Sequence, residues 1–198
     1  FRLIWRAGLA ARLAVGRLLF RSGGLRFRLP EAYSVHAAII EWQSARSRDR
    51  MPDQALGLDP LTRRLMRWSL GSPERAARMS RLPGGTLVPR LELDWLPAVF
   101  CGAHFALLAD TPPQGPDDDL AAGRAMQRVW LEAARLGLQF QPEMTPLIFS
   151  RYVREGRRFT KDEGALRLAE KLAEEFGRLL APEPVTRAVF FGRLGHGP

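Results

Sequence analysis

One nearly uninterrupted apolar segment, residues 98–109, constrains the fold of this chain more than any other feature. It contains Phe105 and Leu107, with Pro97 just before it and a Thr-Pro-Pro sequence just after. A run of this length between helix breakers is typical of a strand that is buried on both faces. A second strand is expected from Val185 to Leu194, which is rich in valine and phenylalanine.

Most of the remaining sequence has helical signals. Asp59-Pro60 and Ser72-Pro73 each combine an N-cap residue with a proline at the first helical position. Thr160 and Glu163 have the spacing of a capping box, and Gly137 suits a left-handed C-cap. Helices are expected at about 1–20, 30–46, 60–70, 73–81, 118–136 and 160–180, and an extended loop at 86–97. The pattern predicts a helix-rich α+β domain with a small, mostly antiparallel sheet flanked by helices.

The charge distribution is uneven along the chain. The formal net charge is +9, and only Lys161 and Lys171 are lysines, so 28 of the 30 basic residues are arginine. Seven arginines precede Glu31, and four of them interrupt the apolar residues of the first 20 positions. This stretch is too charged for a transmembrane helix and lacks a signal-peptide cleavage pattern, so no membrane insertion is expected. We expect its arginines to be solvated or to pair with acids elsewhere.

Familiar catalytic and metal-binding patterns are absent from the sequence. His36, His104 and His196 lie far apart, and none is spaced from a carboxylate as in a zinc site. We expect His36 to be an ordinary core or surface histidine and His104 to find a buried hydrogen-bond partner. Cys101 is the only cysteine, and we expect it to be a buried structural thiol. A single cysteine favours a reducing, cytoplasmic compartment. Most of the five tryptophans are expected in the core.

A longer motif lies in residues 123–142, where the pattern is G-x-A-x-Q-x-x-W-L-x-A-x-x-L-G-L followed by Gln141-Pro142. This pattern resembles the FMN-dependent nitroreductase family. Supporting stretches are Tyr33 to Trp42, Arg50 to Gly57, Asp59 to Trp68, and the C-terminal Phe190 to Pro198. The resemblance extends over nearly the whole chain from about Tyr33.

The resemblance implies a function and a set of site residues. The family transfers hydride from NAD(P)H through FMN to nitroaromatics, quinones or similar acceptors, as a homodimer with FMN at the subunit interface. The flavin would supply the redox chemistry, so no acid–base dyad is required. Backbone groups near the flavin N5 and O4 edge would come from Gln141, Pro142, Glu143, Met144 and Thr145. Because Pro142 has no N–H, one of the three residues after it would donate to N5.

The resemblance also implies a domain organisation. Residues 1–198 would form one nitroreductase-like domain, in which 33–97 is a helical insertion that covers the flavin and shapes the substrate site. The family's N-terminal arginine cluster and its P-S-x-x-N-x-Q-P-W segment have no counterpart in residues 1–30. The basic pair expected after the last strand would lie beyond Pro198. The resemblance therefore implies that the chain is the C-terminal part of a longer flavoprotein. We expect this part alone to retain FMN poorly.

Two other hypotheses remain open at this stage. The arginine-rich N-terminus also suits a non-catalytic helical module that binds anionic surfaces or nucleic acid, although no nucleic-acid motif is present and no nucleic-acid partner is expected. A degenerate family member that kept the dimer fold and lost FMN would show the same sequence patterns.

Overall fold

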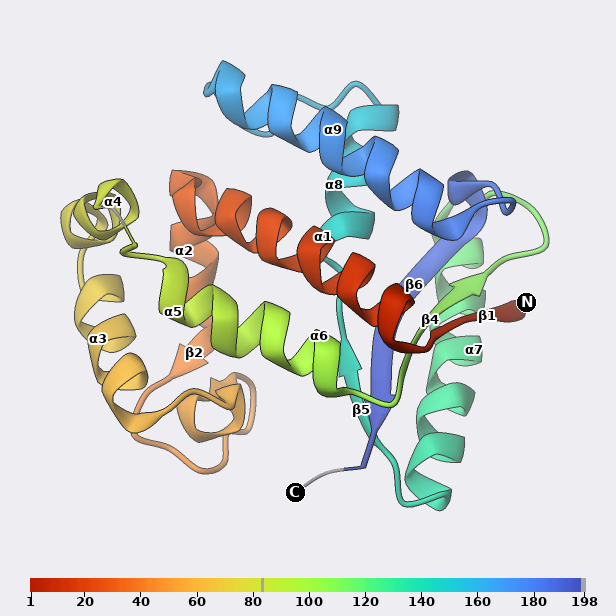
Figure 1. Ribbon diagram of the computed structural model, residues 1–198, viewed down its shortest axis with the longest axis horizontal. Coiled ribbons are helices and arrows are strands. Elements are labelled where there is room, and N and C mark those ends of the chain that lie inside the picture. Colours follow the sequence, from red (N-terminus) through yellow and green to blue (C-terminus); the bar gives the residue numbers. More distant parts are fainter. Residues whose placement is uncertain (83, 197–198) are drawn as a thin grey trace.

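The computed structural model describes residues 1–82 and 84–196 and has the expected α+β architecture. Its centre is a four-stranded sheet in the order β1-β4-β6-β5, with every neighbouring pair antiparallel. The strands are β1 Arg2–Ala7, β4 Ala103–Leu108, β5 Gln139–Pro142 and β6 Ala188–Gly195. Helices cover both faces of this sheet (Figure 1).

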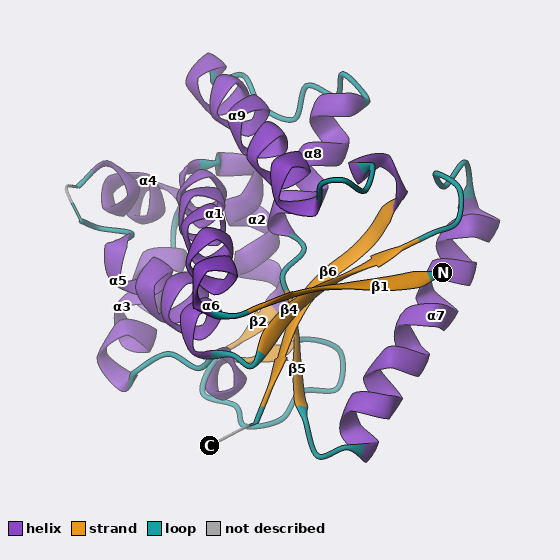
Figure 2. Ribbon diagram, turned by 45° about the vertical axis from the view of Figure 1, so that its right-hand side comes forward, coloured by secondary structure: helices purple, strands orange, loops and turns teal. Residues whose placement is uncertain are grey.

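One face of the sheet is covered by a single helix, α7 (Pro116–Arg135), which stands apart from the other helices in Figure 2. Phe105 and Leu107 of β4 point to this face and pack against Met126 and Ala133 of α7. As expected, α7 is followed by a left-handed glycine, since Gly137 has a φ of 69°. This layer contains much of the resemblance motif.

The opposite face carries the main hydrophobic core. Ala106, Leu108 and Phe191 of the sheet pack there against Leu172 and further apolar side chains of three helices. These helices are α1 Leu9–Arg28, α8 Thr145–Arg154 and α9 Glu163–Leu180. The expected start of α9 is close to correct, but the N-cap is Asp162 rather than Thr160: its carboxylate accepts from the backbone of Gly164 and Ala165.

Residues 30–100 form a helical lobe beside α1 (Figure 1). Its small core contains Ile40, Leu58 and Met66. The predicted starts at Asp59 and Ser72 are confirmed, because both side chains accept hydrogen bonds from the first turn of their helices. The elements are α2 Pro30–Ile39, β2 Ile40–Glu41, β3 Met51–Pro52, η1 Asp53–Leu56, α3 Pro60–Leu70, α4 Pro73–Arg81, α5 Leu87–Arg90, the π-helical η2 Leu91–Trp95 and α6 Leu96–Phe100.

Two predictions for this half of the chain are wrong, and they share a cause. The N-terminal helix was expected to end near residue 20, but α1 continues to Arg28 through Gly23 and Gly24, and residues 87–97 are helical rather than extended. A Cβ atom on Gly23 would lie only 2.0 Å from Asp94 Oδ2, and one on Gly24 would lie 2.9 Å from Arg90 Cζ. The glycines therefore allow the 87–100 helix to pack closely against α1 instead of ending it.

Other boundaries differ from the expectation because pairing partners lie far away in sequence. Residues 2–7 form β1 and pair with β4, so only the later part of the first 20 residues is helical. The apolar segment 98–109 contains the end of α6 as well as β4. The helix that begins at Pro30 ends at Ile39, since Ile40 becomes extended and pairs with Met51.

Further differences lie in the second half of the chain. The strand expected from Val185 begins at Ala188, after the short 3-10 helix η3 Val185–Arg187. Strand β5 and helix α8 were not predicted at all. No tryptophan is fully buried, so the expectation of core tryptophans is wrong; Trp5, Trp68 and Trp130 are about half exposed. Pro83, Gly197 and Pro198 lie outside the described residues, and the last two belong to the resemblance stretch Phe190 to Pro198.

Candidate functional site

A cavity of about 670 Å³ lies where the helical lobe meets the sheet. Its lining includes the turn from β5 into α8 and several residues of the lobe between positions 36 and 66. Arg26 near the end of α1, Asp94 of η2 and Arg193 of β6 also line it. The volume is within the range of protein sites for small molecules.

All five residues that the resemblance assigned to cofactor binding line this cavity. They are Gln141, Pro142, Glu143, Met144 and Thr145. They follow one another through the end of β5 and the first residue of α8, so the strand-to-helix turn presents them together. Residues from the predicted insertion 33–97 line the same cavity. The division of the chain into a core and an insertion stays a prediction.

The backbone N–H groups of this turn are not equivalent. The Glu143 N–H donates to the Phe191 carbonyl oxygen at 2.9 Å and so extends the β5–β6 pairing. Pro142 has no N–H. Within residues 1–82 and 84–196, the Met144 and Thr145 N–H groups have no acceptor. They precede the first turn of α8, where backbone donors are free of intrahelical partners.

The side chain of Glu143 belongs to a buried ion cluster. Its Oε2 lies 2.7 Å from His104 Nδ1, and its Oε1 accepts from Arg193 Nη1 at 2.7 Å. His104 is fully buried, and the Glu143 side chain is 3% exposed. The predicted buried partner of His104 is therefore confirmed and is a carboxylate.

His104 is held in its charged form. Burial alone would lower the pKa of this imidazole, but hydrogen bonds with Cys101 and Glu143 and the charge of Glu143 raise it to about 9. In that form both ring nitrogens donate: Nδ1 to Glu143 and Nε2 to the Ala98 carbonyl oxygen at 3.0 Å. Every charged group of this cluster thus has a buried partner at a short distance. We call it the His104–Glu143–Arg193 cluster.

Arg26 and Asp94 form a second acid–base pair beside the same cavity, with a looser geometry. Arg26 Nη2 lies 3.4 Å from Asp94 Oδ1, a long contact for oppositely charged groups. Arg26 Nε and Asp94 Oδ2 are buried and have no hydrogen-bond partner. Burial raises the pKa of Asp94 to about 6, against the opposing effect of Arg26 and Arg90. Both residues line the cavity, and their unpartnered atoms are buried beneath its surface.

His36 and an aromatic pair complete the chemistry of the lining. Burial, with a smaller contribution from the charge of Arg26, lowers the pKa of His36 to about 4, so its imidazole is neutral at pH 7. The sequence interpretation of His36 as an ordinary histidine missed its place in the cavity. Trp130 and Phe140 line the cavity next to Gln141, and their rings contact one another in a tilted arrangement with centroids 4.6 Å apart.

Cys101 lies beside the His104–Glu143–Arg193 cluster but is outside the cavity lining. It is partly exposed, so the expectation of a buried thiol is wrong. Its Sγ donates to the Ala98 carbonyl oxygen at 3.2 Å and lies 3.5 Å from His104 Nε2. Because Ala98 is the closer partner of Nε2, these contacts connect β4 to α6 and do not resemble a nucleophile–base pair.

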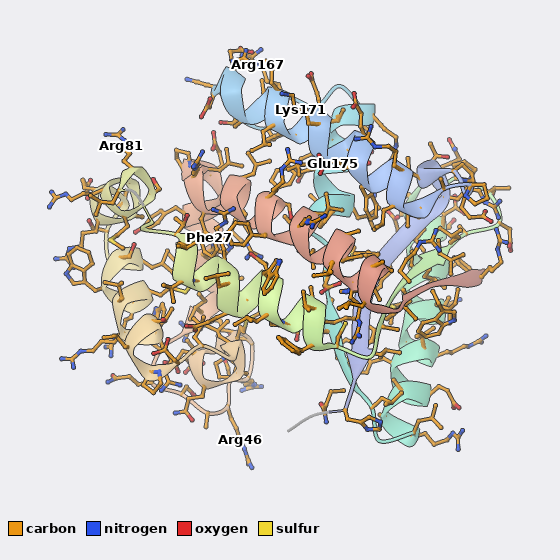
Figure 3. The ribbon with its side chains drawn as sticks, in the orientation of Figure 1. Phe27, Arg46, Arg81, Arg167, Lys171 and Glu175 are labelled. Atoms are coloured by element: carbon orange, nitrogen blue, oxygen red, sulfur yellow. The ribbon has the colours of Figure 1, made fainter. Side chains whose placement is uncertain are left out.

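The N-terminal arginines are largely occupied within the chain. Arg6 donates to the carbonyl oxygens of Leu179 and Leu180 at the end of α9, a position where a cation also complements the helix dipole. Arg2 pairs with Glu183, and Arg21 with Glu175. Figure 3 shows Glu175 on α9, next to α1. The expectation that these arginines pair with distant acids is confirmed for Arg2 and Arg21.

Sequence reasoning missed Arg26, Asp94 and Arg193 as members of the cavity. Nothing in the sequence distinguishes Arg26 from the other N-terminal arginines, and Asp94 lies in a stretch expected to be extended. Only the packing of the 87–100 helix against α1 brings Arg26 and Asp94 together.

Comparisons with known proteins give no match: no family model, no curated protein and no solved structure corresponds to this chain. In residues 1–82 and 84–196, no three metal-ligating side chains gather in a way that could hold an ion. No helix in the described part of the chain is both long and apolar enough to cross a bilayer.

Proposed function

We propose that this chain is an FMN-dependent oxidoreductase of the nitroreductase type, with its flavin in the cavity between the lobe and the sheet. The single observation that carries the proposal is that residues 141–145, identified by the sequence motif alone, all line one cavity. The bound flavin would take hydride from NAD(P)H and pass it to a nitroaromatic, quinone or similar acceptor. The proposed enzyme is a homodimer.

The residues of the cavity are compatible with a flavin. Its volume of about 670 Å³ is sufficient for a ligand of this size. Trp130 and Phe140 supply aromatic side chains to the lining, which a planar ring could contact. The Met144 and Thr145 N–H groups are the backbone donors that remain for a ring nitrogen or carbonyl oxygen. Arg26 adds a cation to the lining.

In this proposal the chain's own residues position the ligand and exclude water. Several lobe residues between positions 36 and 66 line the cavity together with the β5–α8 turn. The His104–Glu143–Arg193 cluster fixes the carboxylate of Glu143, so that the backbone of the same turn stays in place. No side chain is required as general acid or base for the hydride steps.

The direct test is a titration of FMN with purified protein, followed by quenching of flavin fluorescence. We expect saturable binding that is lost in Ala55→Trp, because Ala55 is an exposed residue of the lining and an indole there would fill the cavity. Gln54→Trp is the matched control, since Gln54 is also exposed but is not part of the lining. Equal binding by both variants would contradict the proposed location.

The redox half of the proposal needs a second measurement. Protein-bound FMN should lose its visible absorbance when NADH or NADPH is added without oxygen, and should recover it when a quinone or nitroaromatic is added. A protein that stays colourless in excess FMN but dimerises would instead support the flavin-free alternative.

A further inference from the structure

We propose that a second groove, between α1 and α9, binds a fatty-acid carboxylate: Arg17 and Arg178 hold the carboxylate, and the hydrocarbon chain covers the apolar part of the groove. The two helices lie side by side (Figure 1), and residues 91–95 contribute to the same lining. The groove has a volume of about 860 Å³. It shares no lining residue with the proposed flavin cavity, so the inference goes beyond the proposed function.

The first argument is the apolar character of the accessible lining. Six apolar side chains of the groove keep some exposed surface, and they come from all three helices: Ala11, Ala14, Phe20, Leu91, Trp95 and Leu179. Ala11 and Ala14 lie one turn apart on α1, and their small side chains leave space between the larger ones. Covering such a surface with hydrocarbon removes it from water, which is favourable. The groove therefore suits a ligand with an apolar part.

The second argument is the charge of the same lining, which has four arginines and a single acid. The acid, Glu175, pairs with Arg21, and Arg6 donates to carbonyl oxygens at the end of α9. Arg17 and Arg178 are exposed. Within residues 1–82 and 84–196, neither of these two guanidinium groups has a hydrogen-bond or ion-pair partner. The groove therefore offers two free cations and no free acid, which is complementary to an anion.

The third argument is that the charged and apolar parts of the groove adjoin one another. Arg17 lies one turn after Ala14 on the same face of α1, and Arg178 directly precedes Leu179. Arg178 is in the last turn of α9, where a cation also complements the helix dipole, whereas Arg17 is in the middle of α1 and has no such role.

These features together indicate the class of ligand. An inorganic anion would leave the apolar surface uncovered, and a neutral hydrocarbon would leave both arginines without a partner. A carboxylate accepts two parallel hydrogen bonds from one guanidinium, and a fatty acid joins that group to an apolar chain. The volume of about 860 Å³ is within the range of sites for small molecules, which favours one small ligand over a segment of a partner protein.

The first test compares decanoate with 1-decanol, which has the same chain length but no charge, by titration calorimetry below the micellar concentration. Wild-type protein should bind decanoate at least about tenfold more tightly, the size expected for charge-assisted hydrogen bonds. In the double variant Arg17→Gln with Arg178→Gln this preference should fall to about twofold or less, with decanol affinity unchanged. Arg28→Gln is the matched control, because Arg28 is also exposed on α1 but is absent from the lining; it should keep the preference.

The second test concerns the apolar part of the groove. From hexanoate through octanoate to decanoate, affinity should rise about twofold to fourfold for each added methylene group. Ala14→Phe places a ring in the groove and should weaken decanoate binding at least about tenfold. Ala134→Phe is the control, since Ala134 is an exposed alanine of α7 outside the lining; it should bind decanoate as wild type does.

Several results would overturn the inference. They are equal binding of decanoate and decanol by wild-type protein, loss of the preference in Arg28→Gln as complete as in the double variant, and equal binding of decanoate by the two phenylalanine variants. If decanoate does not bind but phosphatidylglycerol vesicles bind through Arg17 and Arg178, the groove faces a membrane and the inference is wrong.

FMN separates this inference from the proposed function. Decanoate affinity should be the same with and without saturating FMN, because the two sites share no residue. Displacement of decanoate by FMN would place the fatty acid in the other cavity and overturn the inference. If FMN does not bind at all, the proposed function fails, while the results expected for decanoate stay the same.

Discussion

Two buried acid–base groups lie beside the same cavity and differ in how completely their atoms are used. In the His104–Glu143–Arg193 cluster both carboxylate oxygens have partners at 2.7 Å. In the Arg26–Asp94 pair the contact is 3.4 Å, and one buried atom on each side has no partner. A satisfied buried ion cluster rigidifies a structure, whereas an unpaired buried polar atom costs free energy. The first group is therefore expected to stabilise the fold more than the second.

The largest expected effect comes from Glu143→Gln, which would leave His104 and Arg193 buried without a carboxylate. Breaking a buried ion pair by removing one partner costs about 3–5 kcal/mol. Urea unfolding at pH 7 should show a loss of this size. A loss below about 1 kcal/mol would show that the cluster does not hold the fold together.

The second prediction concerns alkaline pH. The folded pKa of His104, about 9, lies above its ordinary value of 6.5, so its contribution to stability is complete below pH 6.5 and is lost as the pH rises through about 9. The shift corresponds to roughly 3 kcal/mol. The free energy of unfolding, measured by urea from pH 6 to 9.5, should fall less steeply in Glu143→Gln than in wild type. Parallel curves would contradict the charged state of His104.

The third prediction tests the packing that places Asp94 beside Arg26. In Gly23→Ala the new methyl group would collide with Asp94 Oδ2, and overpacking of this kind costs about 1–3 kcal/mol. The double variant Gly23→Ala with Asp94→Ala should recover much of that loss. Gly123→Ala is the control, because Gly123 is exposed on α7 with nothing within 4 Å of its Cβ position; it should be neutral or stabilising. Equal losses of stability in both glycine variants would contradict a collision with Asp94 as the cause.

The smallest expected effect is that of Asp94→Asn on stability. Because the folded pKa of Asp94, about 6, is above its ordinary value of 3.8, wild-type protein loses stability as the pH rises from about 4 to 6. The asparagine variant should lack this loss and be equal to wild type or about 1 kcal/mol more stable at pH 8. Destabilisation by more than 2 kcal/mol would place Asp94 among the structural groups instead.

The sequence predicted those parts of the molecule that local chemistry determines. Helix starts at Asp59 and Ser72, the left-handed turn at Gly137 and the buried strand within 98–109 follow from caps, backbone freedom and apolar runs. Strand β1 was missed because its pairing with β4 joins residues about a hundred positions apart. Local patterns carry no information about such contacts.

The residues of the candidate site also include some that the sequence predicts and some that it does not. The motif that ends at Gln141-Pro142 pointed to the turn that lines the cavity, because the signal is contiguous in sequence. Arg26 and Asp94 are 68 residues apart and meet only because Gly23 lets two helices approach closely. The sequence around each residue therefore carries no sign of a pair that forms only through long-range packing.

The most direct measurement of the central claim is amide hydrogen exchange with and without FMN. The account predicts slower exchange in peptides that cover residues 139–148 and 51–58, because residues of both segments line the cavity. Peptides that cover residues 163–177 of α9, which lie outside the lining, should exchange at the same rate in both samples. Unchanged exchange in 139–148 at saturating FMN would contradict the assignment of this cavity as the flavin site.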